Sequence, residues 1–394
     1  MRFLKHLICY LIYPFSFLSI RRKNRYAFGS TKGAFNDNSK YLFIYCQTKR
    51  HDINSAWISI NKETVRHIRE LGFKAYFLLS PKGLYHALTS KYWIFNLYSS
   101  DIMHCLSGTA KCVNLWHGVG LKKIEFNITS GPLVDRYVNK KFKERFNHPE
   151  SFKRPDFLLS STPFQTYAFA KAFRISEKQC LELGYPRNQI LTYSEQERQK
   201  FIATYEQAST RDVIDKIKGK YEKVFIYMPT WRDSQLNIFT QSFNLEKLQS
   251  IMQEKNSLML LKPHVNTIVD KPAFQNYSNI VLLDSNIDTY ALLPYTDVLI
   301  TDYSSVLYDY ILMEGKDVIL YLYDYNEYVH ERDFFYPFDE NVTGKKVYNF
   351  EDLCNSISSN DYKLDETDRI RIIDKFWGDT IKKDSCAEIL KAIE

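Results

Sequence analysis

The sequence predicts an α/β protein with two doubly wound halves, each a parallel sheet covered by helices on both faces. Three observations support this fold. Short apolar runs rich in β-branched residues alternate with helical stretches along most of the 394 residues. The chain is long enough to form two hydrophobic cores. A polar, charge-rich stretch, residues 194–220, separates the two alternating series and is expected to bridge them.

The expected division of the chain follows from this pattern. We expect an N-terminal membrane-associating segment over residues 1–26 and a first Rossmann-like domain over 27–193. The bridge of residues 194–220 then leads to a second Rossmann-like domain over 221–394. In such a pair of doubly wound domains, a ligand is expected in the central cleft that the two domains face.

The first segment is apolar from Phe3 to Ile20, and basic residues follow it from Arg21 to Arg25. A signal peptide would have small residues and a cleavage site after the apolar run. Pro14 interrupts the run, which argues against a spanning helix. We therefore expect an interfacial anchor with its basic residues on anionic headgroups. The alternative is an N-terminal helix packed on the body of the protein.

In the first half, the pattern predicts a helix wherever apolar residues recur at helical spacing and a strand at each short apolar run. The predicted strands are Tyr41 to Tyr45, Lys74 to Leu79, Trp93 to Tyr98, Cys112 to Leu115 and Phe157 to Leu159. The predicted helices are Ala56 to Leu71, Gly83 to Lys91 and Phe164 to Phe173.

The second half repeats the alternation. The predicted strands are Val224 to Met228, Leu258 to Leu261, Ile280 to Leu283, Val298 to Ile300 and Val318 to Leu322. The predicted helices are Leu245 to Lys255, Thr289 to Leu293, the stretch from Ser305 to Met313, and Ser385 to Ile393.

Composition narrows the class of ligand and the compartment. The net charge of +7 is modest and suits anionic ligands or an anionic lipid surface. No basic stripe with interleaved aromatic residues indicates nucleic acid. The seven cysteines are scattered, odd in number and without the spacing of a zinc site, which favours reduced thiols in a cytosolic protein.

The buried strand Val298 to Ile300 organises the prediction of function. Ser304 and Ser305 follow it and stand at the start of the next helix, where either could be the N-cap. Hydroxyls and free backbone N–H groups at the carboxyl end of a buried strand are typical of a phosphate site in an α/β sheet. Taken alone, the same pattern also describes an ordinary capped helix.

His117 lies on a glycine-flanked loop that follows the strand ending at Leu115. Its unperturbed pKa near 6.5 allows an imidazole to take a proton at neutral pH. Gly118 and Gly120 allow the backbone to approach a ligand closely. For an isolated histidine, a loop position without a role is the competing interpretation.

Cationic residues stand after other predicted strands. Arg232 and Lys262 can pair with phosphate oxygens, His264 follows Lys262 closely, and Arg187 adds a cation from the first half. Each residue could instead form an ordinary surface ion pair. Because all of them, with His117 and the two serines, lie at strand ends, together they favour a diphosphate ligand and a phosphoryl or glycosyl transfer.

Five motifs in order then resemble the CDP-glycerol glycerophosphotransferases, which build teichoic-acid-type poly(polyol phosphate) chains of cell walls and capsules. The resemblance runs from about Ala27 to Asp333, most of the chain. The motifs are Trp116-His117-Gly118 with Leu121-Lys122, Gly184-Tyr185-Pro186-Arg187-Asn188, Pro229-Thr230-Trp231-Arg232, Lys262-Pro263-His264 and Thr301-Asp302-Tyr303-Ser304-Ser305.

The resemblance implies a GT-B-like fold, with the acceptor on the side of the first domain and a CDP-polyol donor held mainly by the second. It also implies peripheral attachment to the cytoplasmic face of the cell membrane. His117 would deprotonate the acceptor hydroxyl, while His264 and Arg232 would stabilise charge on the diphosphate. The residues that would contact CDP-glycerol are Trp116, His117, Gly118, Val119, Gly120, Arg187, Pro229, Thr230, Lys262, Pro263, His264, Ser304, Ser305 and Asp309.

The expected reaction transfers glycerol phosphate, or a related polyol phosphate, from CDP-glycerol to an acceptor hydroxyl and releases CMP. The expected partners are a CDP-glycerol or CDP-ribitol donor, a lipid-linked or polymeric acceptor, and an anionic membrane surface. No metal site or required cofactor is expected, and an activating Mg²⁺ is left open.

Two other functions stay open. One is a GT-B glycosyltransferase that uses a CMP- or UDP-sugar for surface polysaccharide synthesis. The other is a membrane-bound nucleotide-binding protein without turnover. The sequence also leaves open the choice between glycerol and ribitol, between priming and polymerisation, the acceptor and the oligomeric state.

Overall fold

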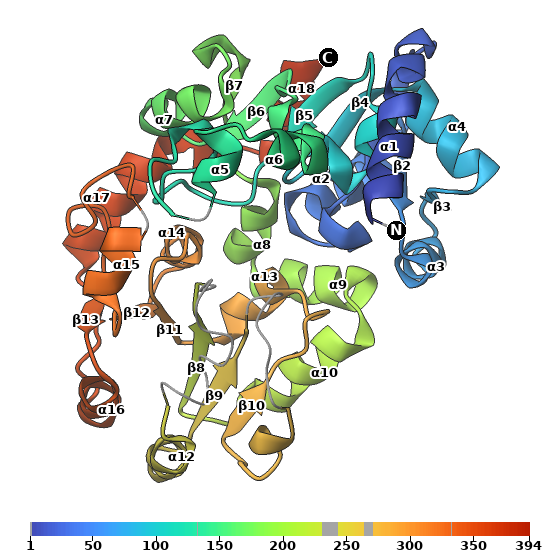
Figure 1. Ribbon diagram of the computed structural model, residues 1–394. Helices are drawn as coiled ribbons and strands as arrows, with labels where there is room; N and C mark the ends of the chain where they lie inside the picture. The colour runs from blue at the N-terminus through green and yellow to red at the C-terminus, as the bar shows by residue number, and fades with distance from the viewer. Residues whose placement is uncertain (1, 132, 231–242, 264–270, 332) are drawn as a thin grey trace. The chain divides into compact units, whose positions relative to one another are not determined.

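The computed structural model describes residues 2–131, 133–230, 243–263, 271–331 and 333–394. The chain divides into two compact units. The first comprises residues 1–189 and 376–394, and the second comprises residues 190–375. Each described unit is built around one parallel sheet with helices packed on it (Figure 1).

The sheet of the first unit has the strand order β3-β2-β1-β4-β5-β6-β7, and its described pairings are parallel. This order places β1 between β2 and β4, so the chain changes direction across the sheet there, as in a Rossmann fold. The strands are β1 (Arg22–Phe28), β2 (Asn54–Ser59), β3 (Ala75–Phe77), β4 (Ser90–Phe95), β5 (Lys111–Asn114), β6 (Phe157–Ser160) and β7 (Cys180–Glu182).

Helices of the first unit connect these strands and cover the sheet. They are α1 (Arg2–Ile12), α2 (Asp37–Lys49), α3 (Lys62–Glu70), α4 (Pro81–Thr89), α5 (Val134–Tyr137), α6 (Phe142–Asn147), α7 (Pro163–Phe173) and α18 (Ser385–Ile393). Short 3₁₀ helices include η1 (Tyr13–Leu18), η4 (His104–Leu106), η5 (Glu125–Asn127), η6 (Pro149–Phe152) and η8 (Pro186–Asn188).

The sheet of the second unit has the strand order β10-β9-β8-β11-β12-β13, and its described pairings are again parallel. Its first central strand, β8, lies between β9 and β11, as β1 lies between β2 and β4. β8 and β11 are the adjacent central strands at its switch point. The strands are β8 (Lys223–Met228), β9 (Ser257–Leu261), β10 (Ile280–Leu282), β11 (Val298–Thr301), β12 (Asp317–Tyr321) and β13 (Lys345–Val347).

The helices of the second unit begin with the stretch expected to bridge the halves. They are α8 (Gln189–Thr192), α9 (Glu195–Tyr205), α10 (Ala208–Ile217), α12 (Leu245–Glu254), α13 (Thr289–Leu292), α14 (Val306–Tyr310), α15 (Tyr325–Glu331), α16 (Phe350–Ser359) and α17 (Glu366–Phe376). β11 is fully buried and lies in the core with β8, β9 and β12, as its run of apolar β-branched residues predicts.

Two predicted elements of the first half are wrong. Tyr41 to Tyr45 was expected to be a strand and lies inside α2, where Leu42 and Phe43 are fully buried. A helix buried on most sides loses the amphipathic period that would identify it, so a short apolar run resembles a strand. The predicted helix Ala56 to Leu71 begins too early, because Asn54–Ser59 form β2 and the helix α3 starts at Lys62.

The expected boundary after residue 26 differs from the structure, because it falls inside β1, the strand between β2 and β4. The first half of β1 is charged and exposed and the second half is buried, so its sequence has no continuous apolar run. Arg21, expected on lipid headgroups, donates hydrogen bonds to the carbonyl oxygens of Ala87 (2.7 Å) and Leu106 (2.8 Å).

The end of the chain also differs from the expected division, because residues 376–394 pack with the first unit. In Figure 1 the red α18 lies among elements of that unit. Phe376 and Trp377 are fully buried, and their rings contact Phe164 and Tyr185 edge to face. Among the described residues, none of the helices combines the length and apolarity needed to cross a bilayer.

Candidate functional site

The loop that carries His117 leaves β5 through a tight turn. Trp116 has a positive φ of 52°, a conformation that is unfavourable for a bulky side chain. The side chain of Asn114 accepts a hydrogen bond from the backbone N–H of Trp116 at 2.9 Å. This turn leaves Trp116 buried and the next residue, His117, exposed. Local strain thus presents the imidazole at the carboxyl edge of the sheet.

Two further contacts hold the glycine positions of this loop. The Tyr185 hydroxyl donates to the carbonyl oxygen of Gly118 at 3.1 Å, and Gly120 N–H donates to Gln165 Oε1 at 2.8 Å. A Cβ atom at Gly120 would lie 2.6 Å from Phe169, so this position has no room for a side chain. Val119, between them, is buried. The predicted donor contacts Trp116 to Gly120 therefore form one rigid loop.

The pKa of His117 is lowered to about 4, chiefly through desolvation by neighbouring protein atoms, although the residue as a whole is exposed. Asp37 raises the pKa, whereas Arg187 and Lys122 lower it. With this pKa the imidazole is neutral at pH 7. A neutral imidazole can accept a proton, as a general base must.

Arg187 lies in η8 and is buried, with 3% of its surface exposed. Its Nη1 donates to Asp37 Oδ1 at 2.6 Å. The structure therefore brings Arg187 and the His117 loop together in one unit, as the sequence predicted. The guanidinium already has a carboxylate partner there, which the sequence analysis did not identify.

In the second unit, the motif around Thr230 lies at the switch point between β8 and β11. Pro229 and Thr230 directly follow β8, and Asp302 directly follows β11. The backbone N–H and the hydroxyl of Thr230 both donate to Asp302 Oδ1, at 2.9 and 2.6 Å. Asp302 is 1% exposed. These two hydrogen bonds join the carboxyl ends of the two central strands, where doubly wound folds bind their ligands.

Lys262 follows β9, as predicted, but its ammonium group is held by the protein. Its Nζ donates to the carbonyl oxygens of Asp284 (2.6 Å) and Ile287 (3.3 Å). Burial lowers its pKa to about 8, opposed by Asp288 and Asp284. Pro263 is half-buried beside it. The lysine therefore connects β9 to the loop after β10.

Ser304 and Ser305 precede α14, which is a single short helix of five residues. The Ser304 hydroxyl accepts a 3.4 Å hydrogen bond from Val306 N–H, whereas the Ser305 side chain makes no capping hydrogen bond. Asp309 is fully buried and accepts a hydrogen bond from the Tyr290 hydroxyl. The serines thus lie after the end of β11, and Asp309 links α14 to Tyr290 of α13.

Two of the three predicted catalytic residues, Arg232 and His264, lie outside the described residues. Among the described residues, no group of three or more His, Cys, Asp or Glu side chains is placed to hold a metal ion.

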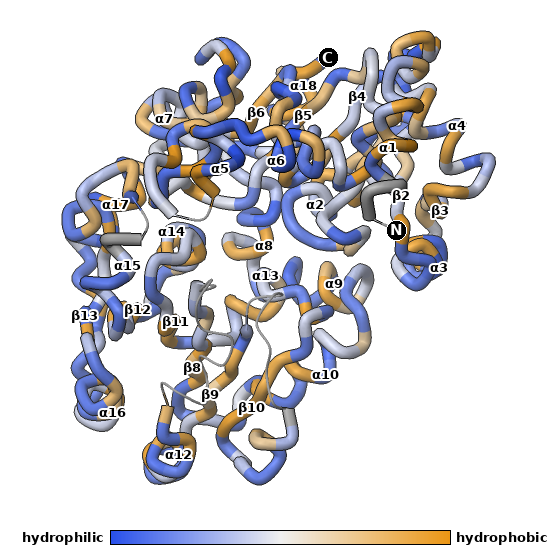
Figure 2. Tube along the Cα trace, viewed as in Figure 1, coloured by the Kyte–Doolittle hydropathy of each residue, from blue (hydrophilic) through white to orange (hydrophobic). Residues whose placement is uncertain are grey.

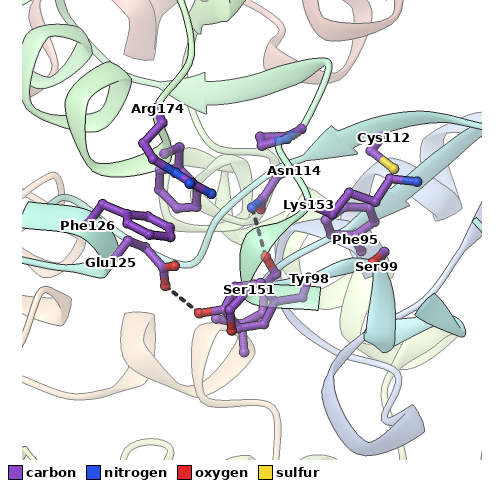
Figure 3. A pocket seen from close by; sticks show the side chains of 13 residues that line it. Phe95, Tyr98, Ser99, Cys112, Asn114, Glu125, Phe126, Ser151, Lys153 and Arg174 are labelled. Carbon is purple, nitrogen blue, oxygen red and sulfur yellow. Dashed lines mark hydrogen bonds between the residues drawn. The ribbon is translucent and has the colours of Figure 1, made fainter. Parts of the chain in front are cut away.

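A cavity of the first unit that is lined by polar and aromatic residues contains none of the predicted site residues (Figure 3). Glu125 points to the Tyr98 hydroxyl, and the Tyr137 hydroxyl donates to the same carboxylate at 3.1 Å. Burial raises the pKa of Glu125 to about 7, opposed by these two hydroxyls. The Arg174 guanidinium lies 3.5 Å from the centroid of Phe126. The cluster anchors the long β5–β6 connection that begins with the His117 loop.

Sequence reasoning missed Asp37, Asn38 and Glu125. It also missed that Asp302 binds Thr230 and so joins the ends of β8 and β11. Asp37 and Asn38 are at the start of α2, which the sequence analysis assigned in part to a strand. Recognising Asn36 as a helix-cap residue before a buried helix was the signal that could have located them. Glu125 has no such signal, because its partners Tyr98 and Tyr137 are brought to it by the tertiary fold.

Comparison with known proteins gives a consistent set of matches. The family model CDP-Glycerol:Poly(glycerophosphate) glycerophosphotransferase matches residues 11–392. A teichoic acid glycerol-phosphate transferase of Staphylococcus aureus is 26% identical over 92% of this chain and 90% of its own. A teichoic acid ribitol-phosphate primase of Bacillus spizizenii is 29% identical, with 75% of this chain and 72% of its own covered.

Among solved structures, the wall teichoic acid polymerase TagF has a similar fold. Its TM-score is 0.74 at 20% identity, and the match covers 100% of this chain and 95% of that chain. This likeness supports the two Rossmann-like units described above.

Proposed function

The chain belongs to the CDP-glycerol:poly(glycerophosphate) glycerophosphotransferase family, and on this premise we propose how its residues carry out the transfer. It is a transferase of phosphate-containing groups that moves glycerol phosphate from CDP-glycerol in wall teichoic acid synthesis. The observation that carries this conclusion is the family match over residues 11–392, which includes every motif of both units.

The acceptor hydroxyl attacks the β-phosphorus of CDP-glycerol. A new P–O bond to the acceptor forms, the P–O bond to CMP breaks, and the hydroxyl proton passes to the imidazole of His117. Such a transfer depends on in-line positioning and on neutralisation of the phosphate charges. His117 suits the role of base because it is exposed on a rigid loop and neutral at pH 7.

The second unit supplies the donor contacts in this proposal. Pro229, Thr230, Ser304 and Ser305 stand at the carboxyl ends of β8 and β11, the position where doubly wound sheets take nucleotides. Lys262, Pro263 and Asp309 would add to these contacts. Lys262 is hydrogen-bonded to the carbonyl oxygen of Asp284, and Asp309 to the Tyr290 hydroxyl. Arg232 and His264 would stabilise charge on the diphosphate. In the first unit, Arg187 and Trp116 to Gly120 are the proposed donor contacts.

The test is an assay of CMP release with CDP-glycerol and, in parallel, CDP-ribitol on a lipid-linked or oligomeric acceptor. We expect faster turnover with CDP-glycerol and a product heavier by one or more glycerol phosphate units. No CMP release with either donor would contradict the transferase function. A glycosidic product from a CMP- or UDP-sugar would replace it with glycosyl transfer.

We propose that no metal or other cofactor is required. The same assay in EDTA decides this point: unchanged turnover supports the proposal. A loss of activity that Mg²⁺ restores would establish a metal requirement.

We also propose that the enzyme binds the cytoplasmic face of the cell membrane through a patch formed by α1, η1 and α6. The patch is apolar and exposed at Leu11 (63%), Phe15 (70%), Leu18 (79%) and Phe142 (83%). Figure 2 shows hydrophobic residues along α1. The exposed Lys140, Lys143 and Arg145 lie on or beside α6. Apolar side chains rimmed by cations are typical of an interfacial segment on anionic lipids.

The α1 and η1 part of the patch packs on the rest of the first unit. Tyr10 stacks on Phe146 of α6 and donates to the carbonyl oxygen of Arg145 at 3.1 Å. Tyr13 stacks on His104, and the Ser16 hydroxyl accepts from Gly108 N–H at 2.9 Å. These contacts confirm the alternative, an N-terminal helix packed on the body of the protein. The interfacial anchor is the proposal made here for the exposed apolar side of this segment.

Sedimentation with vesicles tests the membrane proposal. We expect binding to vesicles containing phosphatidylglycerol, weaker binding to neutral vesicles, and loss of binding in Phe15→Asp/Leu18→Asp. The control Leu79→Asp changes an exposed leucine of the same unit outside the patch. Equal binding by the patch variant and the wild type would contradict the proposal.

A further inference from the structure

The two predicted site loops of the first unit are tied to the start of α2 by residues that no motif contains. Asn38 is fully buried. Its Nδ2 donates to the carbonyl oxygen of Trp116 at 2.9 Å, and its Oδ1 accepts from Arg187 N–H at 3.2 Å. One side chain therefore sets the distance between the His117 loop and η8.

Asp37, the preceding residue, contacts the charged end of Arg187. Its Oδ1 accepts from Arg187 Nη1 at 2.6 Å and from the backbone N–H of Asn38 at 2.8 Å. The Arg187 side chain is 4% exposed and that of Asp37 22%. The Arg187 side chain of this ion pair is therefore buried, whereas the Asp37 carboxylate is partly exposed to solvent.

The backbone of Asp37 is left-handed, with φ at 60°. This conformation is uncommon for any residue except glycine, although aspartate and asparagine tolerate it best. An unfavourable conformation persists only where surrounding contacts determine it, and such positions cluster at functional sites. Trp116, which Asn38 holds, has the same kind of conformation.

Asp37 also acts on His117 through its charge. Among the charged groups that influence the imidazole, the carboxylate of Asp37 raises its pKa, while Arg187 and Lys122 lower it. Contact with the Asn96 backbone raises it as well. When a proton moves onto His117, the charge of Asp37 stabilises the imidazolium, whereas the charges of Arg187 and Lys122 destabilise it. Asp37 is the carboxylate in this set.

We propose that Asp37 is a positioning residue of the transfer reaction, which holds the Arg187 guanidinium and compensates the charge that develops on His117. This rests on the proposed function, in which His117 is the base. Asp37 contacts neither the reacting atoms nor the donor in this role. It acts through Arg187 and His117.

The test uses Asp37→Asn and Asp37→Glu in the full chain. Asparagine keeps the shape and tolerates the left-handed backbone, so the variant removes mainly the charge. The matched control is Asp52→Asn, which removes an exposed carboxylate just after α2 that pairs with Arg50. The assay follows CMP release with CDP-glycerol over a pH series, and thermal unfolding reports the folded fraction.

We expect kcat of Asp37→Asn to fall about tenfold or more, within the range of a perturbed general base. KM for CDP-glycerol should rise less than kcat falls, because the proposed donor contact Arg187 loses only its carboxylate partner. The acidic limb of the pH profile should move to lower pH, since loss of the anion lowers the pKa of His117. Asp37→Glu should recover part of kcat, and Asp52→Asn should match the wild type.

A second measurement does not depend on activity. NMR of the protein labelled with ¹³C-histidine, with His117 assigned through His117→Gln, gives the pKa of that imidazole directly. The proposal expects a lower pKa in Asp37→Asn. An unchanged pKa with unchanged kcat would overturn it. A loss of activity that equals the loss of folded protein, with normal kcat per folded molecule, would also overturn it and leave a structural role.

The two failures are distinguishable. If the wild type releases no CMP from CDP-glycerol or CDP-ribitol, the proposed function fails. The NMR titration still decides whether Asp37 acts on His117.

Discussion

Single residues of the first unit have pKa values that the fold moves in opposite directions. Desolvation lowers the pKa of His117 to about 4, so the imidazole is neutral at pH 7. Burial raises that of Glu125 to about 7, so this carboxyl group holds a proton into the neutral range. His117 is therefore ready to accept a proton at neutral pH, whereas Glu125 accepts hydrogen bonds from two tyrosine hydroxyls and ionises only near neutral pH.

Substitution of His117 by alanine is expected to lower the rate of CMP release by about 10²- to 10⁴-fold, the usual contribution of a general base. KM for CDP-glycerol should change little. In the wild type, activity should be level above about pH 5 and fall below it, because protonation of His117 with a pKa of about 4 removes the base. The exposed His51 serves as control: His51→Ala should behave as the wild type.

Glu125 makes stability depend on pH. Its folded-state pKa of about 7 lies above the ordinary 4.5. The contribution of Glu125 to the free energy of unfolding is therefore complete below pH 4.5 and is lost as pH rises through 7. Thermal unfolding should show that Tm of the wild type falls more between pH 5 and pH 8 than Tm of Glu125→Gln. Equal pH dependence in the two proteins would contradict this assignment.

At the scale of elements, the ends of strands decide where the chemistry lies. In the second unit, β8 and β11 are adjacent although β9 and β10 separate them in sequence. The two motifs that follow them meet for this reason, and Thr230 binds Asp302. In the first unit, α2 replaces a predicted strand, and its first residues bind both Trp116 and Arg187.

Asp302→Ala is expected to loosen the carboxyl ends of β8 and β11. The change leaves the N–H groups of Thr230 and Tyr303 without the acceptor they now share, at about 1–3 kcal/mol for a buried donor. Hydrogen exchange read by mass spectrometry should become faster in both strands. Asp361→Ala, which removes an exposed partner of Lys345, should leave that exchange unchanged.

At the scale of the whole molecule, each unit repeats one topology, and the chain end belongs to the first. The orders β3-β2-β1-β4-β5-β6-β7 and β10-β9-β8-β11-β12-β13 place two strand ends at a switch point in each sheet. Phe376 and Trp377 pack with the first unit although the preceding residues belong to the second. The first unit therefore depends on residues from both ends of the sequence.

Trp377→Ala tests this dependence. The indole is fully buried against Tyr185, whose hydroxyl holds the carbonyl of Gly118. Removal of a buried tryptophan side chain costs about 3–5 kcal/mol, and the His117 loop should lose part of its support. We expect a lower Tm for the first unit and a lower kcat. Leu79→Ala, at an exposed position, should change stability by less than about 0.5 kcal/mol.

The sequence by itself determined the α/β class, most strands of the second half, and the motifs that carry the family resemblance. These features are local, because a buried parallel strand is a short apolar run and a site motif follows its end. Trp116 to Gly120, Thr230 and Ser304 stand at strand ends as predicted.

Only the tertiary structure decided which of these residues have partners. It assigned Tyr41 to Tyr45 to a helix, placed β1 between β2 and β4, and returned residues 376–394 to the first unit. It also paired Arg187 with Asp37 and Glu125 with Tyr98. Such pairings join residues far apart in the chain, and local periodicity contains no information about them. The energies of these pairs come from burial and from electrostatic interaction between their side chains. The side chains approach each other only once the sheet has formed.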